Sequence, residues 1–200
     1  MDVRGRIESA LTSIVRVTNG SEVSWIVGGS AGLMLRGLKL SSEPRDLDIY
    51  SDDADFDRLY DMLQPFAVDK PLLDESGIYR SKLCHFHIDG VSVELVGGFV
   101  VKAHGCRYET EVATLLLPYS DSVYVSEDAT VPVVPLAHEL WFNVLRDRPD
   151  RSQLIIEAYR ADEKSHQEAL AQLEKRNHLS EEAIRHVHDW IIGEPVSVLL

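Results

Sequence analysis

The sequence is short of cysteine, of signal-peptide features and of long hydrophobic runs. Its 200 residues contain two cysteines, Cys84 and Cys106. They are too few for a disulfide framework, and they fit free thiols in a reducing compartment. No apolar run approaches the roughly 20 residues of a membrane-spanning helix, and the first residues do not open a signal peptide. We therefore expect a soluble, cytoplasmic protein without a membrane partner.

Positive charge is also scarce. The chain has 20 Lys and Arg against 33 Asp and Glu, which gives a net charge of −13. A surface that follows nucleic-acid phosphates needs clustered Lys and Arg, and no such cluster is visible, which argues against nucleic acid as a partner. An acidic surface could steer a cationic small molecule, although solubility alone is the simpler interpretation of the charge.

The apolar fraction of 44% is ordinary for a globular protein, and the length allows one domain or one domain with an appendage. Hydrophobic spacing predicts an α/β (α+β) domain over residues 1–134, with a mixed sheet flanked by helices. From Pro135 the pattern becomes helical, so we expect a C-terminal α-helical region over residues 135–200. Helices are expected at residues 1–19, 54–64, 136–146, 151–161, 164–176 and 180–192.

A pair of glycines follows a short apolar run, Trp25 to Val27. Such a run reads as a buried strand that enters a tight turn at Gly28 and Gly29. Ser30 is then the predicted N-cap of a helix that reaches Leu38. The free N–H groups at the start of a helix suit an anion, most naturally a phosphate.

Two carboxylates stand one residue apart shortly afterwards. If residues 46–50 form a strand, Leu47 and Ile49 face the core, and Asp46 and Asp48 project from the other face. Two aspartates side by side repel each other unless a cation lies between them, and oxygen-only ligands suit Mg²⁺ or Mn²⁺. A phosphate cradle with a divalent-metal pair is typical of phosphoryl or nucleotidyl transfer. The alternative is a pair of solvated acids at a strand edge.

A hairpin is predicted at residues 81–88 and 91–96, because Asp89-Gly90 is a strong two-residue turn signal. If the residues that flank this turn pair with each other, His85 lies opposite Glu94. Glu94 then points away from the core, on the face where a third acidic ligand could stand. His85 would hydrogen-bond Glu94 or contact a substrate phosphate, or it is a half-exposed strand histidine. Gly97-Gly98 is expected to end this part of the sheet.

Gly28-Gly29-Ser30 and Asp46-Leu47-Asp48 resemble the signature of the nucleotidyltransferase superfamily. That signature is Gly-Gly/Ser, a helix, then Asp-x-Asp/Glu on a strand, and a third carboxylate on a later strand completes it. The resemblance spans about residues 23–96. It is closest to the small bacterial branch that includes lincosamide and aminoglycoside nucleotidyltransferases and the AbiEii-type toxins.

The resemblance implies a nucleotidyltransferase-like fold and a nucleoside triphosphate as substrate. It implies Mg²⁺ or Mn²⁺ held by Asp46, Asp48 and Glu94, which are also the catalytic residues. The triphosphate would lie against Gly28, Gly29 and Ser30. Arg45 is the cation expected to neutralise it, with Arg36, Lys39, Arg80 and Lys82 as alternatives.

The expected activity is Mg²⁺-dependent transfer of a nucleoside monophosphate to a hydroxyl acceptor, which could be a small molecule such as an antibiotic. Two other functions fit the same residues. One is a nucleotide-binding protein without turnover. The other is a toxin–antitoxin or defence component whose acceptor is a macromolecule.

Overall fold

The computed structural model describes residues 2–193, and the contacts within it divide the chain into two compact units. The sheet unit comprises Met1–Glu75, Arg80–Phe99 and Thr110–Val134. The helical unit comprises Ser76–Tyr79, Val100–Glu109 and Pro135–Leu200. Whether residues 135–200 make up a separate domain stays a prediction, since two short β-segments are grouped with the helices.

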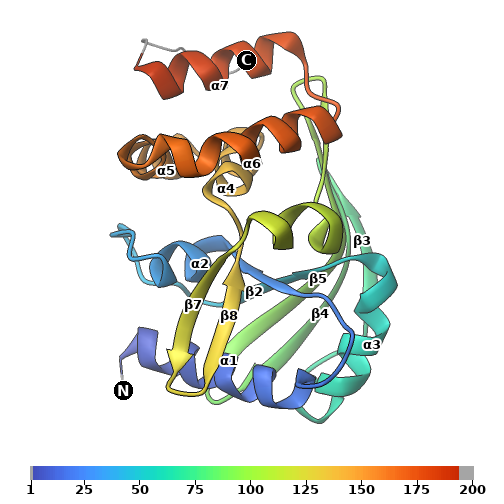
Figure 1. The fold of residues 1–200 in the computed structure, drawn as a ribbon. Coiled ribbons are helices and arrows are strands. Elements are labelled where there is room, and N and C mark those ends of the chain that lie inside the picture. The colour runs from blue at the N-terminus through green and yellow to red at the C-terminus, as the bar shows by residue number, and fades with distance from the viewer. Residues whose placement is uncertain (1, 194–200) are drawn as a thin grey trace. The chain divides into compact units, whose positions relative to one another are not determined.

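The strands form one mixed sheet (Figure 1), which confirms the expected α/β fold. The strand order is β3-β4-β5-β2-β1-β8-β7, and β6 pairs with β5. The strands are β1 (Ile26–Gly28), β2 (Leu47–Ser51), β3 (Leu72–Ser76), β4 (Tyr79–Ile88), β5 (Val91–Ala103), β6 (Cys106–Glu109), β7 (Asp121–Ser126) and β8 (Ala129–Val133).

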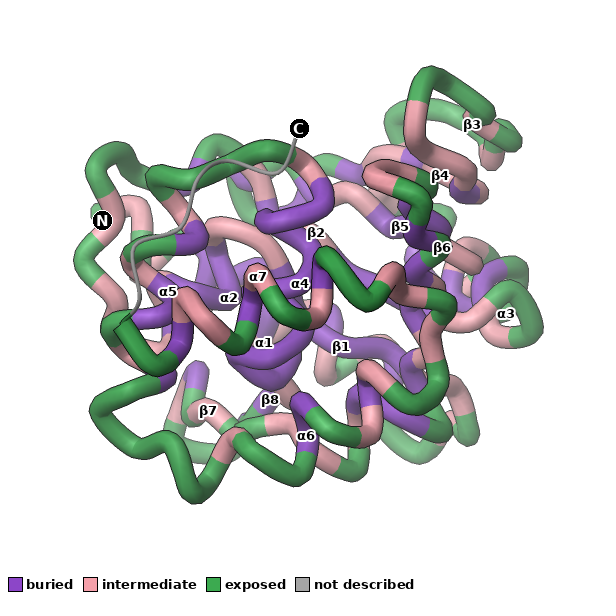
Figure 2. The backbone as a smooth tube through the Cα atoms, turned by 90° about the horizontal axis from the view of Figure 1, so that it is seen from above, coloured by how far each residue is buried: buried purple, intermediate pink, exposed green. Residues whose placement is uncertain are grey.

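The two central strands, β1 and β2, are short, and each has a neighbouring strand on both sides. β1 is buried along its whole length (Figure 2) because it runs antiparallel to β2 on one side and parallel to β8 on the other. The parallel contact with β8 is extended by the N–H of Val134, which donates to the carbonyl of Val27 at 2.9 Å. This arrangement fixes the end of β1, where the glycine turn begins.

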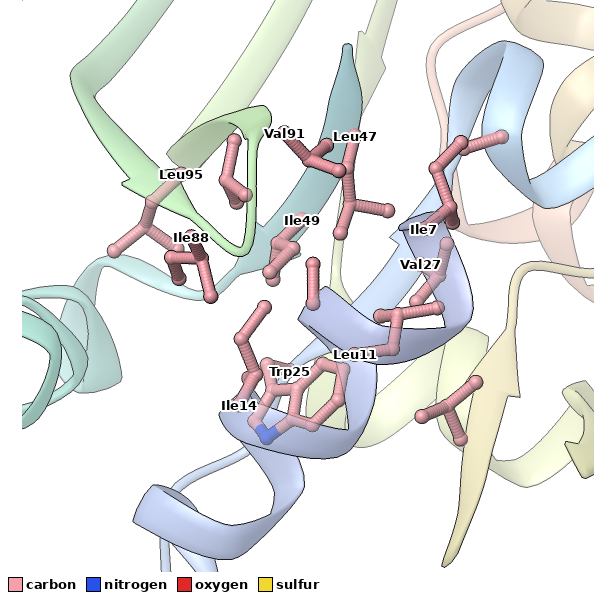
Figure 3. Close-up of a cluster of buried hydrophobic side chains, with 14 of the residues drawn as sticks. Ile7, Leu11, Ile14, Trp25, Val27, Leu47, Ile49, Ile88, Val91 and Leu95 are labelled. Atoms are coloured by element: carbon pink, nitrogen blue, oxygen red, sulfur yellow. The ribbon is translucent and has the colours of Figure 1, made fainter. Parts of the chain in front are cut away.

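Three helices belong to the sheet unit: α1 (Val3–Thr18), α2 (Gly29–Leu35) and α3 (Asp53–Leu63). Ile7, Leu11 and Ile14 recur at helical spacing on α1, and all three are buried. Figure 3 shows them in one cluster with Leu47 and Ile49 of β2. The apolar face of β2 is therefore the face toward α1, as the alternation in the sequence predicts.

The hairpin of β4 and β5 turns at Asp89 and Gly90, which have φ values of 49° and 79°. Two successive positive φ values are those of the type I′ turn that the sequence predicts. The prediction that Gly97-Gly98 ends the sheet is wrong, since β5 continues to Ala103. A Cβ on Gly97 would meet the Phe56 ring at 2.4 Å, so this glycine lets α3 approach the strand closely.

The helical unit contains α4 (Leu136–Val144), α5 (Pro149–Ala161), α6 (Glu163–Arg176) and α7 (Glu181–Ile192). Every residue of α4 is buried, because α5 and α6 both pack on it. Ser180 caps α7 as the sequence predicts, and its hydroxyl accepts from the N–H of Ala183 at 3.2 Å. None of the helices found between residues 2 and 193 is both long and apolar enough to cross a bilayer.

Candidate active site

Asp48 and Glu94 lie side by side on neighbouring strands. β2 and β5 are parallel, and the register pairs Asp48 with Glu94. The residues on either side, Leu47 with Val93 and Ile49 with Leu95, are paired as well, and all four are buried. Because side chains alternate along a strand, Asp48 and Glu94 share the face that does not enter the α1 core. Both carboxylates are half-buried.

The glycine turn closes directly onto Asp48. Gly28 pairs with Asp48 across β1 and β2, and Gly29 has a φ of +60°. A Cβ on Gly29 would stand 2.0 Å from Oδ2 of Asp48, so a larger residue there would displace the carboxylate. At Gly28 the space is taken by the ring of Tyr50, 2.2 Å from a Cβ. The two glycines thus permit close packing of the turn on β2.

The prediction that Ser30 caps the following helix is wrong. α2 begins at Gly29, Gly28 is the N-cap, and no side chain caps the helix. The helix thus begins two residues earlier than an N-cap at Ser30 would place it, with a glycine of positive φ as its first residue. Ser30 is therefore in the first turn and half-buried. The helix also ends at Leu35, earlier than the predicted Leu38.

Asp46 immediately precedes β2 and is half-buried. Burial raises the pKa of Glu94 above its ordinary value, and the negative charge of Asp46 raises it further, while His85 acts in the opposite direction. The negative charges of Glu94 and Asp46 therefore repel each other. With Asp48 in register beside Glu94, negative charge from three carboxylates is concentrated at one end of β2 and β5.

Arg45 and Asp46 line a small cavity of about 40 Å³ at the start of α1. Arg6 and the Gly90–Val91 end of the hairpin contribute to the same cavity, and Arg45 itself is exposed. The structure therefore puts Arg45 in one cavity with Asp46, while its contact with a triphosphate stays a prediction.

Two of the alternative cations are engaged elsewhere. Arg36 donates from Nε to the carbonyl of Val134 at 3.1 Å and forms an ion pair with Asp121. Its side chain is 8% exposed. Lys82 forms an ion pair with Asp57. Arg36 thus fixes the end of β8, and neither cation contacts the glycine turn through these bonds.

His85 lies beside Glu94, as the hairpin register predicts. Its Nε2 is 3.7 Å from Oε1 of Glu94, which is ion-pair distance and longer than a hydrogen bond. The ring is instead hydrogen-bonded to Asp69, with 2.6 Å between Nδ1 and Oδ2. No sequence pattern points to Asp69, because a lone exposed acid before Lys70-Pro71 resembles an ordinary loop residue.

All three predicted metal ligands are carboxylates, and hard oxygen donors are the ligands that Mg²⁺ prefers. The kind of donor thus fits the ion. In residues 2–193, however, no three His, Cys, Asp or Glu side chains are already gathered closely enough to hold a metal. Binding of the ion by Asp46, Asp48 and Glu94 therefore stays a prediction.

Comparison with known families gives a match to a sequence model described as aminoglycoside-2″-adenylyltransferase, over residues 10–154. The matched segment includes the glycine turn and all three acids. None of the curated protein sequences compared with the chain matches it significantly.

Among solved structures, a candidate nucleotidyltransferase from Thermotoga maritima is 22% identical, with a TM-score of 0.59 over 72% of this chain and 86% of its own. ANT(2″)-Ia in complex with adenylyl-2″-tobramycin is 10% identical, with a TM-score of 0.49 over 85% of this chain and 98% of its own. Lincomycin-bound LnuA, a lincosamide adenylyltransferase, is 12% identical, with a TM-score of 0.43 over 73% of this chain and 94% of its own. The first of these establishes the shared fold.

Proposed function

The chain belongs to the aminoglycoside-2″-adenylyltransferase family, and from this premise we propose that it transfers a nucleoside monophosphate from a triphosphate to a hydroxyl group of a small acceptor. One observation carries the proposal. The glycine turn closes onto Asp48, and Asp48 is in register with Glu94 on the open face of the sheet. The glycine turn and two acids are thus adjacent although they are distant in sequence, which supports a site for a phosphate and its ion.

The three acids share one task in this proposal. Asp46, Asp48 and Glu94 would hold Mg²⁺, and the triphosphate would lie against Gly28, Gly29 and Ser30 with Arg45 near its outer phosphates. When bound, the ion supplies positive charge that neutralises the phosphates and polarises the α-phosphoryl group. Burial and the nearby charge of Asp46 both raise the pKa of Glu94, so a positive charge would be favoured at this place.

The transfer itself requires one bond to form and one to break. The acceptor oxygen bonds to the α-phosphorus, and the bond from that phosphorus to the bridging oxygen breaks. The electron pair of that bond leaves with pyrophosphate, and the proton of the hydroxyl passes to solvent or to Glu94. A raised pKa makes Glu94 a better proton acceptor, so a role as base is the alternative to its role as third ligand.

The acceptor class follows from charge and from the family. A net charge of −13 attracts cations from solution. A polyamine sugar with free hydroxyl groups combines positive charge with the required nucleophile. We therefore propose an aminoglycoside-like acceptor, and adenylyl as the transferred group, in line with the description of the family.

The direct test is pyrophosphate release from ATP, GTP, CTP and UTP with Mg²⁺, using tobramycin, lincomycin and no acceptor. We expect release that needs both Mg²⁺ and an acceptor, together with an acceptor product heavier by one nucleoside monophosphate. Asp48→Asn should reduce the rate by about a hundredfold or more, because a carboxylate that holds the ion is lost. Asp61→Asn is the matched control, since Asp61 is an exposed acid of α3.

Two results would assign the protein differently. Nucleotide binding without pyrophosphate release for any acceptor would indicate a binding protein without turnover. Transfer of labelled nucleotide to RNA or protein in a cell extract, with no transfer to the small acceptors, would indicate a component that modifies a macromolecule.

A further inference from the structure

Asp69 holds His85 through two separate hydrogen bonds. Its Oδ1 accepts from the backbone N–H of His85 at 2.7 Å, and its Oδ2 is bonded to the ring Nδ1 at 2.6 Å. Burial alone would raise the pKa of Asp69, but the hydrogen bonds from the backbone and ring of His85, with the charge of that ring, lower it below its ordinary value. Asp69 therefore binds the ring as a carboxylate, which can only accept hydrogen bonds.

The segment that carries Asp69 is attached to β4 at His85 itself. The N–H of Val68 donates to the carbonyl of His85 at 2.9 Å, and Ala67 forms an antiparallel bridge with Phe86. Phe86 is buried, so the strand is anchored from its core face at this position. Backbone and side chain of His85 are thus both fixed by two successive residues from outside the hairpin, Val68 and Asp69.

The hydrogen bond to Asp69 determines which ring nitrogen of His85 faces Glu94. Because both carboxylates can only accept, Nδ1 donates to Asp69, and Nε2, which faces Glu94 at 3.7 Å, can hold that carboxylate when it also carries a proton, as in the imidazolium form. The side chains of His85 and Glu94 are 34% and 32% exposed, so both lie at the rim of the open face. The ring of His85 thus contacts Asp69 through one nitrogen and Glu94 through the other.

We propose that Asp69 and His85 are a positioning pair that aims the carboxylate of Glu94 at the ion held with Asp46 and Asp48. This inference rests on the proposed function. Carboxylate ligands of metals are commonly oriented by a surrounding hydrogen-bonded group, whose loss costs about 10- to 100-fold in metal affinity or activity. Neither Asp69 nor His85 touches the ion or the substrate in this arrangement.

The test measures Mn²⁺ affinity, by electron paramagnetic resonance, and kcat and KM for the triphosphate. His85→Ala should weaken Mn²⁺ binding by about 10- to 100-fold and lower kcat, with a smaller effect on KM. Asp69→Ala should shift both quantities in the same direction. In the Glu94→Gln background, His85→Ala should have no further effect, because the group that it positions has already lost its charge. His87→Ala is the control, since His87 is exposed on the same strand.

Two conservative variants separate positioning from a purely structural role. The amide of Gln in His85→Gln can reach the place of Nε2, whereas that of Asn in His85→Asn can replace only the bond of Nδ1 to Asp69. We expect His85→Gln to regain part of the Mn²⁺ affinity and His85→Asn to behave like His85→Ala. Recovery by His85→Asn alone would show that the pair merely attaches residues 67–69 to β4, and would overturn the inference.

The failure of this inference can be distinguished from that of the proposed function. If Glu94→Gln lowers Mn²⁺ affinity or kcat but His85→Ala and Asp69→Ala change neither, the positioning role is wrong and the function stands. If Glu94→Gln itself changes neither quantity, Glu94 has no part in the site and both proposals are overturned. Thermal unfolding of each variant verifies that the fold is retained.

Discussion

The negative charge of Glu94 opposes folding. Burial and the charge of Asp46 favour its protonated form in the folded state. A carboxyl group whose pKa is raised by folding stabilises the protein at pH values below its unfolded pKa, and this contribution is lost as pH rises through the folded pKa. Such a cost is common where acids gather for a function, because the bound ion removes it.

We predict that Glu94→Gln unfolds at a higher temperature than the wild type at pH 7 in the presence of a chelator. The amide removes the unfavourable charge, and each kcal/mol gained corresponds to about 2–4 °C for a chain of this size. The difference should vanish near pH 4, where the wild-type residue is protonated. Mg²⁺ should raise the melting temperature of the wild type and leave that of the variant unchanged. An unchanged or lower melting temperature at pH 7 would contradict the prediction.

His138 is a second residue whose ionisation opposes folding. It is fully buried on α4, stacked on Phe142 with 5.3 Å between ring centres, and hydrogen-bonded through Nδ1 to the hydroxyl of Tyr108 at 2.8 Å. Burial lowers its pKa to about 3. The neutral imidazole is therefore the form that the helical unit requires.

We predict that acid weakens the fold through His138. Between its unfolded pKa near 6.5 and its folded pKa near 3, the unfolded chain binds a proton that the folded chain does not, so stability falls as pH is lowered. The loss from one such group is at most about 1.4 kcal/mol per pH unit. Urea unfolding between pH 4.5 and 7.5 should show a shallower pH dependence for His138→Phe. Curves that stay parallel to the wild type would contradict it.

In the turn between β1 and α2, one glycine meets two structural requirements. Gly29 combines a positive φ with a close approach to Asp48, so it serves the backbone and the site together. Gly20 also has a positive φ, of 75°, but nothing lies within 4 Å of where its Cβ would be. The two positions therefore separate backbone strain from displacement of the carboxylate.

We predict that Gly29→Ala and Gly20→Ala share a cost of roughly 1–2 kcal/mol, since both place alanine in the left-handed region. Only Gly29→Ala should also weaken Mn²⁺ binding and activity, by about tenfold or more, because its Cβ displaces the Asp48 carboxylate. Chemical unfolding and Mn²⁺ titration measure the two effects. Equal effects of both variants on Mn²⁺ binding would mean that the contact with Asp48 is not important to the site.

Sequence periodicity predicts those parts of the site that lie on regular strands. Alternation places Asp48 opposite Leu47 and Ile49, and the Asp89-Gly90 turn places His85 near Glu94. It does not predict the contact of Asp69, which depends on a single bridge between a loop and β4. Nor does it predict that β5 continues past Gly97, where residues Val100 to Ala103 pair with β6.

At the scale of the whole molecule, the net negative charge is larger than the candidate site accounts for. Three carboxylates account for a small part of a net charge of −13. An excess of this size creates a field that raises the local concentration of cations and speeds their association, by about 10- to 1000-fold in favourable cases. Salt screens this field. The Debye length, over which the field decays, falls from about 10 Å at 0.1 M to about 3 Å at 1 M.

We therefore predict that kcat/KM for a polycationic acceptor such as tobramycin falls as NaCl is raised from 50 to 500 mM (about one order of magnitude or less), while kcat changes little. The N-acetylated form of the same acceptor is the matched control, since it keeps the hydroxyl groups and loses the charges. Its kcat/KM should be lower at low salt and nearly independent of NaCl. If both acceptors respond to salt alike, the effect belongs to the triphosphate and its ion, and the acidic surface has no part in selecting the acceptor.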